Sequence, residues 1–357
     1  VGWASLALAM LTKGLVALVL PAGAVLLYSV WQRDWALWKH LHIIKGLLLF
    51  LLLAAPWFIA VSLANPEFAQ FFFIHEHFAR YTSEVHERSA PWWYFIPVFM
   101  AGVLPWTAVT LQSLYRPLVQ AGTRTVNGFD AERFLLVFTL FVLVFFSLGQ
   151  SKLASYILPV MPVVGVLAGR QLALQGYRKI DAWSLLVLAV VLLVCAWQAA
   201  HFASDVTPAA MFTAYRPWFI AASLLLAGAA LAGFRGRPTR PGHVATIGIL
   251  VLLAFQLLTW GFQSLSGSRS SRELAMAIQS AVPDGTAVYA VATYPQSLPF
   301  YLQQTITLVS KKDEMQMGIE LEPDNVAAHA RYRFFRELSE EQRERFVAML
   351  LGRDLDP

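Results

Sequence analysis

Apolar runs long enough to cross a membrane recur along most of this chain. A bilayer core is about 30 Å thick, which an α-helix crosses in roughly 20 residues. After a partial run at 2–11, full or nearly full runs occupy 15–31, 46–63, 93–113, 134–149, 156–173, 183–200, 217–234 and 243–264. Because hydrocarbon offers the backbone no hydrogen-bond partners, each run must be helical. The sequence therefore predicts a polytopic α-helical membrane domain over residues 1–264, with about eight full spans and a partial one.

Composition and charge agree with this class. The chain is 57% hydrophobic and 14% charged, which excludes a water-soluble globular fold for most of it. The one cysteine, Cys195, lies in an apolar run, so a disulfide framework and a thiolate metal site are both excluded. Residues 1–264 carry 17 Lys and Arg against nine Asp and Glu, whereas 265–357 carry 10 against 13. Since the positive excess belongs to the membrane part, nucleic acid is not an expected partner.

Basic residues in the connecting loops predict the orientation of the spans. They form four clusters on alternate loops: Arg33, Lys39 and Lys45; Arg116, Arg124 and Arg133; Arg170, Arg178 and Lys179; Arg235, Arg237 and Arg240. The positive-inside rule assigns such loops to the cytoplasm. The remaining loops, among them 64–92, and the tail from about 265 then face outward.

The tail has a different pattern from the membrane part. Residues 271–282 are predicted to form a helix, and 288–291 and 305–309 to form short strands. Residues 326–351 are polar and helical in pattern, and the tail has no glycine-rich phosphate loop. We therefore expect residues 265–357 to form a small extramembrane α/β domain without chemistry of its own.

Two lysines interrupt the apolar part, Lys13 within Leu-Thr-Lys-Gly and Lys152 within Gln-Ser-Lys-Leu-Ala-Ser-Tyr. A lysine in the membrane costs about 2.5–3.5 kcal/mol, so it usually faces a cavity and meets an anion. The predicted topology places both on the outward side. If the chain is helical there, Tyr156 shares a face with Lys152, and an ammonium and a hydroxyl together can hold a phosphate. The alternative for each lysine is to extend along apolar surface to the interface.

The outward loop 64–92 is predicted to be an amphipathic helix lying on the membrane. At about 100° per residue, one half of the helix is apolar and the other polar. The apolar half holds Phe68, Phe71, Phe72, Ile74, His75 and Phe78; the polar half holds Gln70, Glu76, His77, Arg80 and Glu84, with Phe73 as an exception. Glu76 and His77 could bind a divalent cation, or Glu76 could pair with Arg80 in solvent.

A further pattern is the GxxxG match at 165–169, which is typical of close helix packing.

Several motifs in order resemble a known family. They are the Leu-Thr-Lys-Gly turn, Asn65-Pro-Glu-Phe with Glu76-His-Phe-x-Arg-Tyr81, Pro91-Trp-Trp-Tyr-Phe95, Leu104-Pro-Trp106, and Ser151-Lys-x-x-Ser-Tyr-x-Leu-Pro159. Together they resemble the polyprenyl-phosphate-dependent glycosyltransferases of the dolichyl-phosphate-mannose protein mannosyltransferase superfamily, in particular the bacterial aminoarabinose transferases that modify lipid A. The resemblance covers residues 2–175 well; beyond them it is one of architecture only.

The resemblance implies a GT-C fold in the bacterial inner membrane, with a cavity and a C-terminal domain on the periplasmic side. The implied reaction is an inverting transfer of a hexose or pentose from undecaprenyl phosphate to lipid A, another envelope glycan or a protein. Lys13, Lys152 and Tyr156 would bind the lipid phosphate, and Arg80, Tyr81 and Arg88 would contact substrate. His77, with Glu76, would lie near a divalent metal ion.

The family's catalytic base is an aspartate in the first periplasmic loop, and no aspartate in residues 1–175 matches it. We therefore expect this sequence to be an N-terminally truncated fragment that lacks the base and is inactive alone. A transporter or flippase of a lipid-linked anion is the alternative function, because it would use the same lysines without a base. A structural protein of the outer leaflet explains the two lysines poorly.

The predicted topology can be tested with single cysteines at Gln175 and Ser280 in a Cys195→Ala background. An impermeant thiol reagent applied to intact cells is expected to label the Ser280 site and to spare the Gln175 site. The opposite labelling pattern would contradict the topology and the placement of both lysines.

Overall fold

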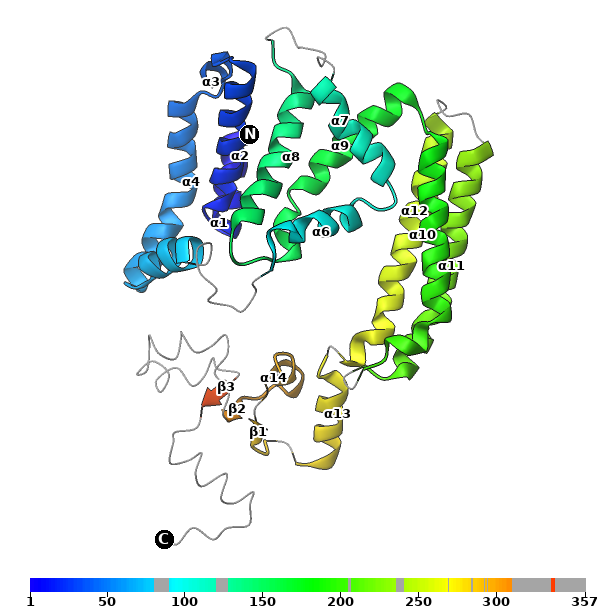
Figure 1. The fold of residues 1–357 in the computed structure, drawn as a ribbon. Coiled ribbons are helices and arrows are strands. Elements are labelled where there is room, and N and C mark those ends of the chain that lie inside the picture. Colours follow the sequence, from blue (N-terminus) through cyan, green and yellow to red (C-terminus); the bar gives the residue numbers. More distant parts are fainter. Residues whose placement is uncertain are drawn as a thin grey trace. The chain divides into compact units, whose positions relative to one another are not determined.

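A computed structural model describes residues 1–79, 90–119, 128–204, 207–235, 241–268, 270–283, 285–291, 293, 295–309 and 335–337. The chain divides into two compact units, one formed by Val1–Val191 with Ala222–Ala254 and the other by Leu192–Ala221 with Phe255–Pro357. The helices of the first unit, in order, are α1 (Gly2–Lys13), α2 (Val16–Gln32), α3 (Ala36–His40), α4 (Ile43–Ala64), α6 (Phe95–Gly102), α7 (Thr107–Val119), α8 (Ala131–Leu148) and α9 (Val160–Gln175) (Figure 1). They are followed by α10 (Lys179–Trp197), α11 (Ala209–Arg235) and α12 (Pro241–Gly261).

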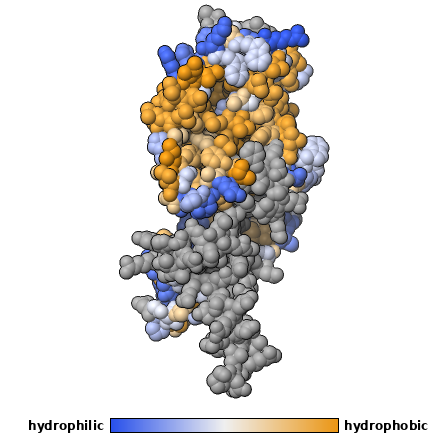
Figure 2. Space-filling view, turned by 90° about the vertical axis from the view of Figure 1, so that its left-hand side faces the viewer, coloured by the Kyte–Doolittle hydropathy of each residue, from blue (hydrophilic) through white to orange (hydrophobic). Residues whose placement is uncertain are grey.

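The predicted membrane spans are confirmed as helices. Among the described residues, five helices are long and apolar enough to cross a membrane, or six if a bent pair counts as one span. Helices α2 and α9 are apolar but shorter. Leucine and isoleucine side chains of α4 remain exposed along its length: Ile44, Leu48, Leu52, Ile59 and Leu63. Figure 2 shows apolar side chains gathered in a broad band on the face that includes α4, with hydrophilic residues at either end, as expected for a surface that meets lipid.

Helices α2 and α8 pack against each other in antiparallel directions. The Tyr28 hydroxyl near the end of α2 accepts a hydrogen bond from the Asp130 backbone N–H just before α8 (2.7 Å). Further along, Gly23 of α2 lies directly against the ring of Phe141 in α8. The first turn of α2 is therefore at the same end of the pair as the last turn of α8.

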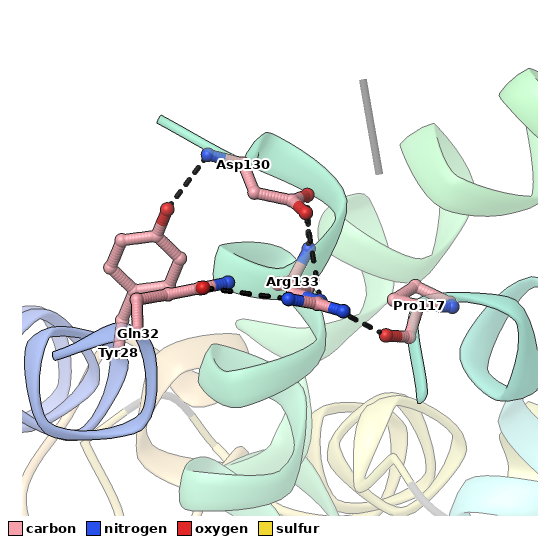
Figure 3. Close-up of polar contacts among 5 residues, drawn as sticks. All are labelled: Tyr28, Gln32, Pro117, Asp130 and Arg133. Atoms are coloured by element: carbon pink, nitrogen blue, oxygen red, sulfur yellow. Dashed lines mark hydrogen bonds and ion pairs between the residues drawn. The ribbon is translucent and has the colours of Figure 1, made fainter. Parts of the chain in front are cut away.

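A polar network fastens the start of α8 to its neighbours (Figure 3). Asp130 caps the helix by accepting a hydrogen bond from the Arg133 backbone N–H (3.1 Å). The Arg133 guanidinium donates to the Pro117 carbonyl of α7 (3.2 Å) and to Gln32 of α2 (3.4 Å). In the same turn, Glu132 forms an ion pair with Arg170 of α9. One short segment thus joins α8 to three other helices.

The predicted span at 93–113 is wrong as a single straight helix. A short 3-10 helix, η2 (Trp92–Tyr94), leads into α6, and α6 and α7 meet at an angle of 117°. The Leu104–Pro105 peptide bond between them is cis. Before the bend, the buried residues Phe95 and Phe99 of α6 and Val103 at its C-cap belong to a core that also contains Phe146 and Ile157.

The outward loop also differs from its prediction. Residues Gln70–Ala79 form a π-helix, η1, rather than an α-helix. A π-helix has i→i+5 hydrogen bonds and more residues in each turn, so positions projected at 100° per residue do not apply. Phe72 and Phe73 both pack with Phe58 of α4, with ring centroids 5.3 and 5.8 Å apart. Phe73, the exception on the predicted polar half, is therefore part of an apolar contact.

The tail contains a small α/β arrangement, as predicted. Strands β1 (Val288–Val291), β2 (Ile306–Val309) and β3 (Phe335–Glu337) form a parallel sheet in the order β1-β2-β3. Helices α13 (Arg272–Ala281) and α14 (Leu298–Leu302) contribute to its core, in which Ala275, Ala290, Leu298, Leu302 and Ile306 are buried. The second unit also contains the 3-10 helices η4 (Ala199–Phe202) and η5 (Phe262–Ser268) and one end each of α10, α11 and α12. The domain boundary after residue 264 stays a prediction.

Close helix approach occurs at other glycines than those of the GxxxG match. A Cβ placed on Gly165 or Gly169 would meet no described atom of another element within 4 Å, so the packing prediction is wrong for this chain. In contrast, a Cβ on Gly46 of α4 would collide with the indole of Trp3 in α1. That indole is held in place because its Nε1 donates to the Leu41 carbonyl (2.8 Å).

Substitutions at these glycines should therefore have opposite effects. We expect Gly46→Ala to destabilise the protein by about 1–3 kcal/mol, because the Trp3 ring cannot move aside without losing its hydrogen bond. Gly165→Ala should be neutral or stabilise α9 by up to about 1 kcal/mol through helix propensity. Thermal unfolding of both variants in detergent measures the difference, and an equal loss in the two would contradict this packing.

Candidate functional site

Lys152 lies just beyond the end of α8 and is almost completely buried, with 8% of its surface exposed. Its Nζ donates a hydrogen bond to the carbonyl oxygen of Gly149, the C-cap of α8 (2.6 Å). The backbone between Lys152 and the next helix is extended, with Leu153 at φ −134° and ψ 134°. The helical turn on which a shared face of Lys152 and Tyr156 depended is therefore not formed.

Tyr156 is nevertheless brought to the same end of α8 by another route. It belongs to a 3-10 helix, η3 (Ala154–Ile157), and its ring packs on Phe146 with centroids 5.1 Å apart. Next to Lys152, the Ser151 hydroxyl is buried and has no hydrogen-bond partner among the described residues. Ser151 was not predicted as a site residue although it lies inside the motif, because nothing in the sequence indicates that a serine beside a lysine is buried.

Lys13 is the last residue of α1 and is exposed, in contrast to Lys152. Gly14 ends the helix with φ 82°, a conformation that favours glycine, and α2 starts two residues later. The antiparallel pairing of α2 with α8 places Lys13 and Lys152 at the same end of this pair. Predicted site residues from two distant segments thus lie on one side of the helical bundle.

The electrostatics of Lys152 favour an anionic ligand. Within the described part of the chain, no carboxylate forms an ion pair with this ammonium group. The positive charge of the Lys152 ammonium is offset in part by the Gly149 carbonyl and by the negative end of the α8 dipole, which is worth roughly half a charge. A buried ammonium with one hydrogen bond retains donors for an incoming anion.

The predicted loop residues cannot be placed with the lysines. Arg80, Tyr81 and Arg88 lie outside the described residues, as do the side chains of Glu76 and His77. The assignment of His77 to a polar face and of His75 to an apolar face assumed the 100° per residue of an α-helix. Because η1 is a π-helix, that projection does not apply to it. In the described part of the chain, no group of three or more His, Cys, Asp or Glu side chains could hold a metal ion.

Comparison with known sequences identifies the relatives of this chain. Residues 274–349 match the family model of the aminoarabinose transferase C-terminal domain. A transferase of Erwinia tasmaniensis, named undecaprenyl phosphate-α-4-amino-4-deoxy-L-arabinose arabinosyl transferase, is 33% identical over 217 residues, or 56% of this chain and 38% of the relative. One of the same name from Pseudomonas paraeruginosa is 34% identical over 190 residues, or 52% of this chain and 33% of the relative. The chain thus matches well under half the length of these relatives.

Comparison with solved structures defines the class of protein. The crystal structure of ArnT from Cupriavidus metallidurans bound to undecaprenyl phosphate matches 94% of this chain and 59% of that protein, with a TM-score of 0.79 and 31% identity. Its apo form matches with a TM-score of 0.78. The chain is a polytopic membrane protein with a GT-C-type fold and a C-terminal domain. The particular resemblance predicted from its motifs, to the aminoarabinose transferases, is confirmed.

Replacing Lys152 with methionine tests whether this residue is held for a ligand. We expect Lys152→Met to raise the melting temperature, because it removes a buried charge that costs about 2.5–3.5 kcal/mol in a membrane. Lys39→Met, at an exposed position of α3, is the matched control and should change little. A lower melting temperature for Lys152→Met alone would show that the lysine serves mainly to cap α8.

Proposed function

We propose that this protein is an integral membrane glycosyltransferase that uses a sugar linked to undecaprenyl phosphate. The observation that carries the proposal is Lys152, a buried ammonium without a carboxylate partner among the described residues, at the same end of the helical bundle as Lys13. The fold around it matches a protein crystallised with undecaprenyl phosphate. A lipid phosphate is the anion that such a site would hold.

The two lysines would act on the leaving group. In the transfer, an acceptor hydroxyl oxygen forms a bond to the anomeric carbon while the bond from that carbon to the phosphate oxygen breaks. The electron pair of the broken bond stays on undecaprenyl phosphate, and the hydroxyl proton passes to a base. Fixed ammonium groups at the phosphate stabilise the charge that develops there. The Tyr156 hydroxyl, on η3 at the same end of α8, would add a hydrogen bond.

The names of the relatives favour a particular donor and setting. We infer a 4-amino-4-deoxy-L-arabinose donor, and hence a pentosyl transfer, with lipid A, another envelope glycan or a protein as acceptor. That the transfer is inverting is part of the proposal and comes from the family resemblance. The alternating basic loops support a position in the bacterial inner membrane with the C-terminal domain in the periplasm. A divalent ion near Glu76 and His77 remains part of the proposal, to be tested by metal analysis of His77→Ala.

Binding of undecaprenyl phosphate to the purified protein in detergent tests the proposal directly. Lys152→Met and Lys13→Met should each weaken binding by about ten- to a hundredfold, since a charge-assisted hydrogen bond contributes roughly 1.5–3 kcal/mol. Lys39→Met should bind as the wild type does. In membranes of the host, the same two variants should transfer less sugar to acceptor.

The alternative functions give different results. Wild-type binding by both lysine variants would contradict the phosphate site. Movement of the lipid-linked sugar across proteoliposome membranes, without formation of a glycosylated product, would favour the transporter instead.

A further inference from the structure

A buried carboxylate at the start of α10 has no part in the proposed phosphate chemistry. Asp181 is 2% exposed, and no ion pair with it is formed within the described part of the chain. Its Oδ2 accepts a hydrogen bond from the Arg178 backbone N–H (3.0 Å). Its Oδ1 has no hydrogen-bond partner among the described residues. A buried carboxyl group is costly unless hydrogen bonds and nearby positive charge compensate for its lost hydration.

Two helix N-termini meet at this carboxylate. Asp181 is in the first turn of α10 and caps its own helix through Arg178. The backbone N–H of Val109, in the first turn of α7, favours the charged form of the same side chain, without a hydrogen bond to its Oδ1. First-turn N–H groups have no partner inside a helix, and each N-terminus carries about half a positive charge. The two together offset roughly the one negative charge of Asp181.

Two more contacts join the turn before α10 to the beginning of α7. The ring of Tyr177 meets that of Trp106 edge to face, with centroids 6.3 Å apart and an interplanar angle of 89°. The Arg178 guanidinium donates to the Gln112 side-chain oxygen (2.6 Å). Burial, together with the Asp181 carboxylate, raises the pKa of the Tyr177 hydroxyl, which therefore stays neutral. Tyr177 and Arg178 thus contact the beginning of α7 at two points.

The start of α7 is also the point where the span bends by 117°. On the other side of the bend, α6 contacts η3, and Phe95 and Phe99 share a core with Ile157. Gly102 at the end of α6 also lies next to the Met161 side chain of α9, since a Cβ on this glycine would come within 2.9 Å of it. The position of α7 therefore bears on η3, the segment that carries Tyr156 and follows Lys152.

We propose that Asp181 is a positioning residue for η3, the segment that carries Tyr156: by holding the turn at Tyr177 and Arg178, which contacts the start of α7, it fixes the bend and hence the seat of η3 against α6. The residue does not touch the phosphate. The expected effect of Asp181 on the binding of undecaprenyl phosphate rests on the proposed function.

Spin labels provide a test that needs no ligand. Labels at Ile96 of α6 and Val166 of α9, both exposed, are introduced as cysteines in a Cys195→Ala background. The distance distribution between them should be narrow in the parent protein and broader or shifted in Asp181→Ala. Asp181→Asn retains a side-chain oxygen acceptor and should restore most of the narrow distribution.

Ser223→Ala is the matched control for a loss of stability alone. The buried Ser223 hydroxyl donates to the Ala189 carbonyl (2.7 Å), which joins α11 to α10 without contact to α7. This variant should lower the melting temperature and leave the spin-label distances unchanged. A folded Asp181→Ala protein with the parental distribution would overturn the proposal, as would a Ser223→Ala protein with the same broadening.

The second measurement is the Kd for undecaprenyl phosphate. Couplings between distant sites typically span factors of roughly 5–150, and we expect Asp181→Ala to raise Kd about tenfold. Asp181→Asn should lie close to the parent, and Ser223→Ala should equal it. Altered distances with an unchanged Kd would overturn the positioning role. Absence of binding by the parent protein would contradict the proposed function, while the spin-label distances would still decide whether Asp181 fixes the bend.

Discussion

Helix α8 has polar attachments at both ends, and the packing of the neighbouring helices depends on them. At its start, the Arg133 guanidinium reaches the Pro117 carbonyl and Gln32, while Glu132 pairs with Arg170. At its end, the Gly149 carbonyl receives Lys152. In hydrocarbon, water cannot satisfy such groups, so the protein itself must supply the partners. The need to pair polar groups within the protein therefore accounts for the contacts at the start of α8. It also accounts for the contact of the buried Lys152 ammonium with the end of α8, at the candidate site.

The broken span shows how irregular backbone is accommodated beside a site. A bend of 117° between α6 and α7 leaves the first N–H groups of α7 without helical partners. The turn that contains Asp181 lies beside the start of α7, where the Trp106 and Tyr177 rings meet and Arg178 donates to Gln112. Because of the bend, α6 can lie against η3 rather than continue straight through the membrane. In the proposed arrangement, the position of η3 thus depends on contacts made by a different helix.

Part of the candidate site could be predicted from the sequence. Lys13 and Lys152 stand out because each interrupts an apolar run, and the alternation of basic loops is enough to put them on one side. Their relation to Tyr156 could not be predicted correctly, since a four-residue spacing has meaning only in a helix and Leu153 is extended. Burial of Ser151 and Asp181 left no trace in the local sequence, because it results from segments that are distant along the chain.

The sequence by itself determined the membrane class, the position of most spans, the loop charge pattern and the α/β character of the tail. These properties depend on local hydropathy, charge and secondary-structure propensity, which are set by residues close together in the sequence. Only the tertiary structure decided the antiparallel contact of α2 with α8, the bend at 103–106 and the π-helical course of Gln70–Ala79. It also decided that Gly46 and not Gly165 meets a neighbouring element. Each of these depends on which distant side chains fill the adjacent space, and periodicity within a segment carries no information about that.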